Sequence, residues 1–144
     1  MKAITLYEPW ASLCILGFKK IETRKHDRFR KLKDSRILIH AAKEYDDSTE
    51  FLNYLNEDQI KEIERLIETD HFKKTAGKLI GSVIVFDTGR LNERDSPKAL
   101  IDCSDGRRYG LFLASPVMFK KFISYKGQRS IFNVPDVLIS QRQV

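Results

Sequence analysis

Residues 3–24 read AITLYEPWASLCILGFKKIETR, and this stretch decides most of what can be inferred about the fold. The segment 2–6 is short and β-branched, which is typical of a strand. Pro9 suits the first turn of a helix, where its missing N–H costs no hydrogen bond. Gly17 suits the left-handed position just after a helix end. We therefore expect an opening strand over 2–6 and a short helix over 9–16.

Two further helices are predicted from capping patterns in the middle of the chain. Asp47 followed by Glu50 has the spacing of a capping box and predicts a helix near 48–55. Asn56 followed by Gln59 has the same spacing and predicts a second helix over 57–69, with apolar residues on one face and acids on the other.

The remaining elements are predicted to be short strands. The segments that favour strands are 36–41, 78–88, 108–113, 119–125 and 130–134, followed by 137–139 near the C-terminus. A few helices combined with about six short strands indicate the α+β class. We expect a single domain over residues 1–144, built as a β-barrel with two to four helices packed on it.

Composition excludes several classes of protein. The chain has 144 residues and no run of about 18 apolar residues, so no membrane span is expected. The N-terminus lacks the pattern of a secretory signal, and two distant cysteines indicate reduced core thiols in a cytoplasmic protein. The three histidines lack metal-ligand spacing, and no glycine-rich phosphate-binding motif occurs. We therefore expect neither a metal nor a cofactor.

Charge is distributed unevenly along the chain, whose net charge is +6. Residues 19–36 carry nine Lys or Arg against three acids, whereas residues 44–70 carry ten acids against two bases. One acidic segment of net charge −8 thus masks a remainder of +14. Such an asymmetry favours a polyanionic partner, and nucleic acid is the first candidate.

The chain closely resembles ASCH domains, which are related in fold to PUA RNA-binding domains. Their opening pattern is Pro-Trp at a helix start and then G-x-K-x-x-E-x-R, matched here by Pro9 and Trp10, and by the run from Gly17 to Arg24. RILIHAAK at 36–43 resembles the strand that ends in the family's I-H-A-x-K signature. GKLIGSVIVFD and the closing segment with Lys126–Gly127 resemble later parts of the family pattern.

The resemblance implies a PUA-like β-barrel with a cleft beside the first helix, lined by the G-x-K-x-x-E-x-R segment. It also implies RNA binding, so the leading hypothesis is recognition of single-stranded RNA or a modified nucleotide in that cleft. Within the cleft Lys19 and Arg24 would grip phosphate, and Glu22 would accept hydrogen bonds from an exocyclic amine. The predicted ligand-binding residues are Trp10, Lys19, Lys20, Glu22, Arg24, His40, Lys43, Lys126 and Arg129.

Several of these residues also have a structural interpretation that involves no ligand. Lys19, Glu22 and Arg24 could form an ordinary salt bridge worth about 0–1 kcal/mol, and an extended segment would put Lys19 on the opposite face unless the preceding turn persists. Trp10 fits a packing anchor as well as a stacking platform for a base. His40 ends an apolar strand, where histidine is more often a hydrogen-bonded structural residue.

Two alternative functions stay open. Some family members are hydrolases, which would give a nucleoside- or RNA-directed enzyme using Lys19 and Glu22 as catalytic residues. In the branch that deacetylates N4-acetylcytidine, however, the nucleophile is a threonine at the position that Glu22 occupies here. The other alternative is a protein-interaction module that binds through the acidic helices.

Overall fold

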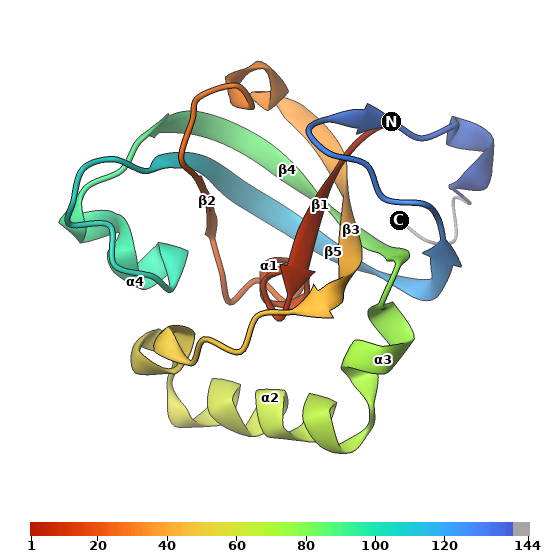
Figure 1. Ribbon diagram of the computed structural model, residues 1–144, viewed down its shortest axis with the longest axis horizontal. Helices are drawn as coiled ribbons and strands as arrows, with labels where there is room; N and C mark the ends of the chain where they lie inside the picture. The colour runs from red at the N-terminus through yellow and green to blue at the C-terminus, as the bar shows by residue number, and fades with distance from the viewer. Residues whose placement is uncertain (140–144) are drawn as a thin grey trace.

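A six-stranded mixed sheet forms the body of the computed structural model, which describes residues 1–139 (Figure 1). The strands are β1 (Lys2–Glu8), β2 (Ile21–Arg24), β3 (Ser35–Tyr45), β4 (Lys78–Arg90), β5 (Tyr109–Ser124) and β6 (Phe132–Asn133). Their order across the sheet is β2-β5-β4-β3-β1-β6. β1 and β3 are parallel, and the other neighbours are antiparallel.

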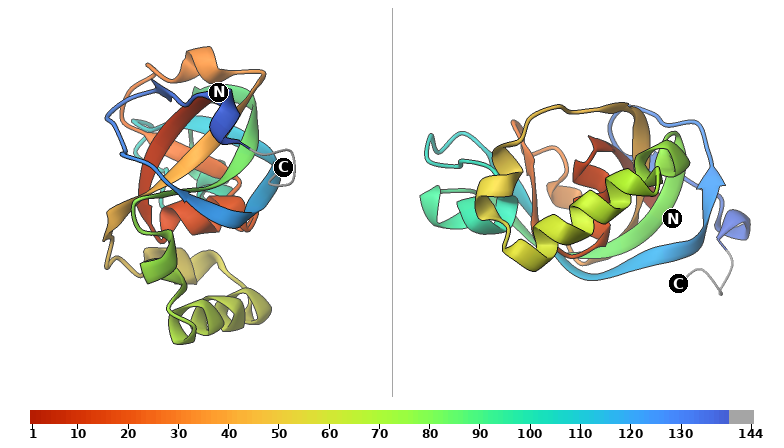
Figure 2. Two further views of the ribbon diagram at one scale, coloured as in Figure 1. Left: turned by 90° about the vertical axis from the view of Figure 1, so that its right-hand side faces the viewer. Right: turned by 90° about the horizontal axis from the view of Figure 1, so that it is seen from below.

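The helices are short except for one. They are α1 (Trp10–Ile15), α2 (Glu57–Glu68), α3 (His71–Thr75) and α4 (Ser96–Ala99), with 3-10 turns at Arg30–Leu32, Glu50–Tyr54, Glu93–Asp95 and Asp136–Leu138. α1 packs against the strongly curved sheet, and its buried face joins a core that includes Ile4, Ile39, Ile80 and Leu111. α2 lies at the opposite end of the molecule from the Arg30–Leu32 turn (Figure 2).

The capping patterns had opposite outcomes. The Asn56 side chain accepts a hydrogen bond from Gln59 N, and the Gln59 side chain accepts one from Asn56 N, so the predicted capping box of α2 is confirmed. The box predicted at Asp47 is wrong, and a 3-10 turn replaces the helix expected near 48–55. The reason is that the Glu50 carboxylate instead accepts from Asp102 N at 2.7 Å.

The strands expected near 2–6, 36–41, 78–88 and 130–134 are present, whereas β2 was not among the expected strands. The segments 108–113 and 119–125 belong to one strand, β5, which continues through Pro116. The ladder with β4 has register shifts there, and β2 pairs with β5 only as far as Phe112. Pro116 therefore deprives no ladder of a required donor. The strand expected at 137–139 is wrong, because Asp136–Leu138 is a 3-10 turn.

The sheet is not closed into the predicted barrel. β2 and β6 form its two edges, and β6 pairs with β1 only at Lys2 and Ala3. The outer edge of β1 beyond Ala3 is consequently left without a strand partner. The α+β class and the count of six strands are confirmed. Among the described residues no helix is both long and apolar enough to cross a membrane.

Candidate functional site

A polar cleft lies between β1 and β2, on the free edge of β1, and it has two connected parts. The inner pocket has a volume of about 320 Å³ and is lined by Trp10, Lys19, Glu22, Arg24, Asp46 and Arg108, among others. The outer groove has a volume of about 1080 Å³ and is lined by Arg24, His40, Lys43, Lys126, Gly127 and Arg129, among others. Thr5, Tyr7 and Arg24 line both parts and join them.

Lys19 reaches the inner pocket because the turn after α1 persists through it. Gly17 takes φ +81°, a left-handed conformation that glycine adopts at little cost. The Leu13 carbonyl then accepts hydrogen bonds from both Phe18 N and Lys19 N, each at 3.0 Å. This turn places Lys19 on the same side as Glu22, which resolves the alternative that an extended segment would have separated them.

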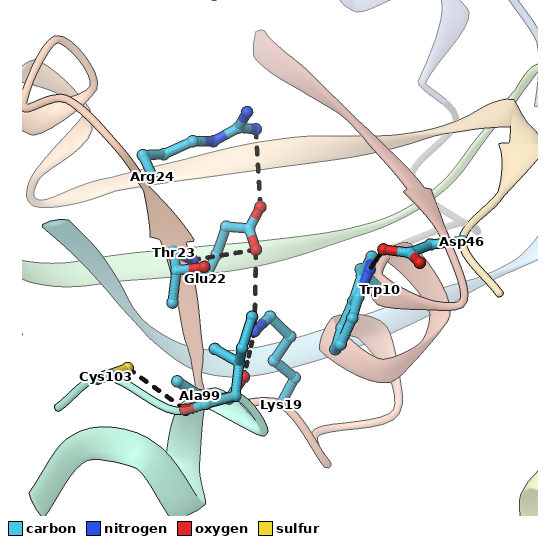
Figure 3. Close-up of polar contacts among 9 residues, drawn as sticks. Trp10, Lys19, Glu22, Thr23, Arg24, Asp46, Ala99 and Cys103 are labelled. Carbon is cyan, nitrogen blue, oxygen red and sulfur yellow. Dashed lines mark hydrogen bonds and ion pairs between the residues drawn. The ribbon is translucent and has the colours of Figure 1, made fainter. Parts of the chain in front are cut away.

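Glu22 stands between the two cations of the motif (Figure 3). Its Oε1 lies 4.0 Å from Lys19 Nζ, and its Oε2 lies 3.6 Å from Arg24 Nη2. Among residues 1–139 its one shorter polar contact is the hydrogen bond that Thr23 N donates to Oε1 at 3.1 Å. The carboxylate is thus held by charge at distances that leave its oxygens able to accept hydrogen bonds from a ligand.

The Lys19 ammonium is almost fully buried, with 2% of the residue exposed. It donates a hydrogen bond to the Ala99 carbonyl and lies 4.9 Å from the centre of the Trp10 ring. Burial lowers the pKa of Lys19 from its ordinary value, and the neighbouring Glu22 carboxylate opposes that shift. Loss of the Lys19 proton, which gives the neutral amine, is therefore easier in this pocket than it is for a lysine in water.

Trp10 forms one wall of the inner pocket and is also a packing residue. Its Nε1 donates to Asp46 Oδ2 at 2.9 Å, and its ring meets Phe51 edge to face at 5.8 Å. The hydrogen bond lowers the pKa of the Asp46 carboxyl. The indole is thus anchored in the fold and also lines the cleft, while its role as a stacking platform stays a prediction.

His40 lies under the outer groove with both ring nitrogens engaged. Its Nε2 donates to the Tyr125 carbonyl at 2.7 Å, because a carbonyl can only accept, and Nδ1 is then free to accept from Thr5 Oγ1 at 3.2 Å. A Cβ on Gly127 would lie 2.6 Å from His40 Cε1, so the chain at Gly127 approaches the ring too closely for any side chain. His40 thus fastens the segment 125–130 over the groove.

The remaining predicted residues divide between the groove and another surface. Lys43, Lys126 and Arg129 are exposed and line the outer groove, where they form a basic rim. Lys20 does not line the cleft, and its side chain borders a separate hollow beside Phe86 and Lys98. Lys19 borders that hollow as well, but of the two neighbouring lysines Lys19 alone also lines the inner pocket.

Two residues of the inner pocket lie outside the motif: sequence reasoning missed Asp46, and it considered Arg108 only as a possible phosphate contact on a basic rim. Asp46 reaches Trp10 through the parallel register that pairs Glu8 with Tyr45, and Asp46 N donates to the Glu8 carbonyl. Arg108 arrives through the pairing of β2 with β5, in which Arg24 lies opposite Tyr109. Both depend on long-range pairing, and no local pattern in the sequence would have indicated either residue.

A second set of buried polar groups lies on the other side of α1, and we call it the buried cluster: Glu8, Ser12, His71 and Thr75. Glu8 accepts from Ser12 N at 2.8 Å, Ser12 Oγ at 2.6 Å and Thr75 Oγ1 at 2.7 Å. The Ser12 hydroxyl donates its one hydrogen bond to Glu8. His71 Nε2 must therefore be the donor in its contact with Ser12 Oγ, at 2.9 Å. These bonds tie α3 to α1 and β1, and none of the four residues lines the cleft.

Within residues 1–139 no group of three or more His, Cys, Asp or Glu side chains is arranged to hold a metal ion. Cys14 and Cys103 are both buried and unpaired.

An open mixed sheet with a few helices and a two-part polar cleft beside its first strand places the chain in the α+β class. A family model described as the ASCH domain matches residues 4–109, and the chain belongs to that family. A search of curated proteins gives no match.

Solved structures show the same fold. The crystal structure of ASCH from Zymomonas mobilis is 12% identical, with a TM-score of 0.60 over 95% of this chain and 89% of that one. Two variants of that protein also match. A variant with serine replaced by alanine gives 11% identity, a TM-score of 0.58 and coverage of 95% and 89%. A variant with tyrosine replaced by phenylalanine gives 11% identity and a TM-score of 0.57, over 95% of this chain and 91% of that one. Identities this low support the likeness of fold alone.

Proposed function

We propose that the cleft binds single-stranded RNA or a modified nucleotide, with one base in the inner pocket and the backbone along the outer groove. The observation that carries this proposal is the junction of the two parts at Arg24. A pocket of about 320 Å³ with an aromatic wall opens directly into a groove with a basic rim. An unpaired nucleotide needs both features, since bases stack on aromatic rings and phosphates pair with cations.

Base recognition in the inner pocket would use Trp10 and Glu22. The Trp10 ring offers a surface for stacking, which contributes about 1–3 kcal/mol per base. The Glu22 carboxylate can only accept hydrogen bonds while it is ionised, so it favours a base edge that carries an exocyclic amine. Lys43, Lys126 and Arg129 would contact the backbone, which positions a strand without selecting its sequence.

Filter binding of a short unpaired RNA over a series of salt concentrations tests this proposal. Phosphate contacts release counterions, so affinity must fall as the salt concentration rises. In a plot of log K against log salt concentration, the slope for a single strand is about −0.7 per phosphate contact. Lys126→Gln should reduce that slope by about 0.7. Lys61→Gln, on the exposed face of α2, is the matched control and should leave the slope unchanged. RNA affinity that is absent, or independent of salt, would rule the proposal out.

A second candidate function is hydrolysis of a nucleoside or of RNA. Its support is the buried Lys19, whose lowered pKa suits a proton-transfer group beside Glu22. Glu22→Gln should then retain ligand binding and lose turnover of an N4-acylcytidine or of RNA. If the wild-type protein forms no product from either substrate, binding alone is the function. We also propose a cytoplasmic location, in keeping with two buried, unpaired thiols.

A further inference from the structure

Two arginines of the inner pocket have hydrogen-bond donors that the protein does not use. The Nε atoms of Arg24 and Arg108 are shielded from solvent, and neither has a hydrogen-bond partner among residues 1–139. Buried donors are almost always paired in folded proteins, and an unpaired one costs about 1–3 kcal/mol. Two such atoms in one pocket indicate that the partner is a ligand.

The charges around these arginines are also incompletely balanced. Arg24 Nη2 lies 3.6 Å from Glu22, and the Arg24 guanidinium packs on the Phe29 ring at 4.7 Å, which fixes its plane. Arg108 forms no ion pair with a carboxylate in the described part of the chain. The other carboxylate of the pocket, Asp46, is occupied by Trp10 Nε1 and by Ser48 N. Asp102 is close enough for Arg108 to contribute to the lowering of its pKa, but no carboxylate of the described residues lies within ion-pair distance of Arg108.

We infer that Arg24 and Arg108 form a phosphate subsite, so that the inner pocket binds a nucleotide with its phosphate and not a bare nucleoside. Phosphate oxygens are acceptors only, and a guanidinium presents its donors in a planar fork that fits them. A neutral base edge could satisfy one donor but could not balance the charge of Arg108. Because Arg24 also lines the outer groove, the subsite lies where a strand would pass from one part of the cleft to the other.

This inference rests on the proposed function, since it concerns the same cleft. The phosphate has two sources, the terminal monoester of a mononucleotide and the internal diester of a strand. The chemistry that Arg24 and Arg108 would recognise is the same for both, so the experiment must separate them.

Fluorescence of Trp10 is a direct readout, because the chain has one tryptophan and it lines the pocket. The probes are adenosine, cytidine, their 5′-monophosphates, a dinucleotide with one phosphodiester, and inorganic phosphate. In the wild type, the monophosphates or the dinucleotide should bind at least about tenfold more tightly than the nucleosides, the change expected from one charge-assisted contact. If the monophosphates bind more tightly than the dinucleotide, the subsite recognises a terminal phosphate. If the dinucleotide binds at least as tightly as the monophosphates, the subsite accepts the internal phosphate of a strand.

Arg108→Gln should remove the advantage of the phosphate and leave nucleoside affinity unchanged. Arg107→Gln is the matched control, because Arg107 is exposed and outside the cleft, and it should change nothing. Arg108→Lys keeps the charge but lacks the Nε–H donor, so it should lose part of the advantage. If the Arg108→Gln protein melts at a lower temperature than the wild type, the Arg108→Lys variant is used for the test in its place.

The inference is overturned if Arg108→Gln keeps the full advantage of the phosphate, or if the wild type binds the nucleosides as tightly as their monophosphates and the dinucleotide. If the wild type still binds RNA in a salt-dependent manner, the proposed function survives that result. Failure of every nucleotide and RNA probe to bind the wild type would overturn both.

Discussion

Two buried glutamates flank helix α1, and they illustrate two different uses of a buried carboxylate. Glu8, 2% exposed, accepts three hydrogen bonds between 2.6 and 2.8 Å from Ser12 and Thr75. Glu22, 6% exposed, has ion pairs at 3.6 and 4.0 Å and one backbone donor. The first carboxylate is saturated by the protein, whereas the second faces a pocket that contains unused donors.

The difference teaches how a structural polar cluster can be distinguished from a candidate site when burial alone cannot. Both glutamates are buried beside hydroxyl or cationic groups. In the buried cluster the Glu8 carboxylate, the Ser12 and Thr75 hydroxyls and His71 Nε2 are all hydrogen-bonded to one another, and no ligand could bind the Glu8 carboxylate without breaking one of these bonds. In the inner pocket Arg24 Nε and Arg108 Nε have none. Unsatisfied groups that line a cavity cost stability, which is typical of binding sites.

The largest effect should come from Glu8→Ala. The substitution leaves three buried donors without an acceptor, and at about 1–3 kcal/mol each we expect a loss of about 3 kcal/mol or more. Glu22→Ala removes one hydrogen bond and two long ion pairs, and loss of the Glu22 charge lets the already lowered pKa of Lys19 fall further, so that Lys19 can become neutral; the loss should therefore be smaller than that of Glu8→Ala. The midpoints of urea unfolding measure both. Equal losses in the two variants would break the comparison.

A smaller effect is expected at the wall of the inner pocket. Trp10→Phe keeps an aromatic ring but removes the hydrogen bond to Asp46, which should cost about 1 kcal/mol of stability. Asp46→Asn retains an acceptor for the indole and serves as the control, with a smaller loss. A destabilisation by Trp10→Phe as large as that of Glu8→Ala would show that Trp10 acts mainly as a core residue.

The smallest effect concerns the pH dependence of stability. Burial lowers the pKa of His71 below its ordinary value of 6.5, and Arg65 and Lys74 add to the shift while Glu62 opposes it. Below about pH 6.5 the unfolded chain takes up a proton that the folded protein resists, so stability falls as the pH falls. His71→Gln should flatten the stability curve between pH 7 and pH 5. Burial raises the pKa of Glu8, which acts in the opposite sense but is common to both proteins.

Wild-type and variant curves that stay parallel over this range would contradict the neutral, hydrogen-bonded His71 of the buried cluster. Melting temperatures in matched buffers from pH 5 to pH 8 suffice for this test, because only the difference between the two proteins is needed.

Local signals in the sequence predicted the parts of the fold that local chemistry determines. Gly17 ends α1, and Asn56 with Gln59 begins α2, as the residue types indicate. The sequence favoured two strands, at 108–113 and 119–125, where the structure has the single strand β5. The strand continues through Pro116 because its pairing with β4 resumes beyond the shift in register. The open edge of β1 could not be inferred either, since strand partners depend on the whole topology.

The candidate site divides in the same way. Lys19, Glu22 and Arg24 lie together because one short segment carries all three. Arg108 and Asp46 arrive from distant segments through strand pairing, and no spacing in the sequence relates them to the motif. The roles of these residues in binding stay predictions, and their placement in one pocket is what the structure adds.

The most direct test of the account is NMR mapping of the wild-type protein as an unpaired RNA oligonucleotide is added at low salt. We predict shifts at the Trp10 indole N–H and at the Nε–H groups of Arg24 and Arg108. The His71 ring and Thr75 should remain unshifted, because the buried cluster is closed to ligands. Shifts confined to the acidic face of α2 or to the buried cluster, with the inner pocket unperturbed, would contradict the account.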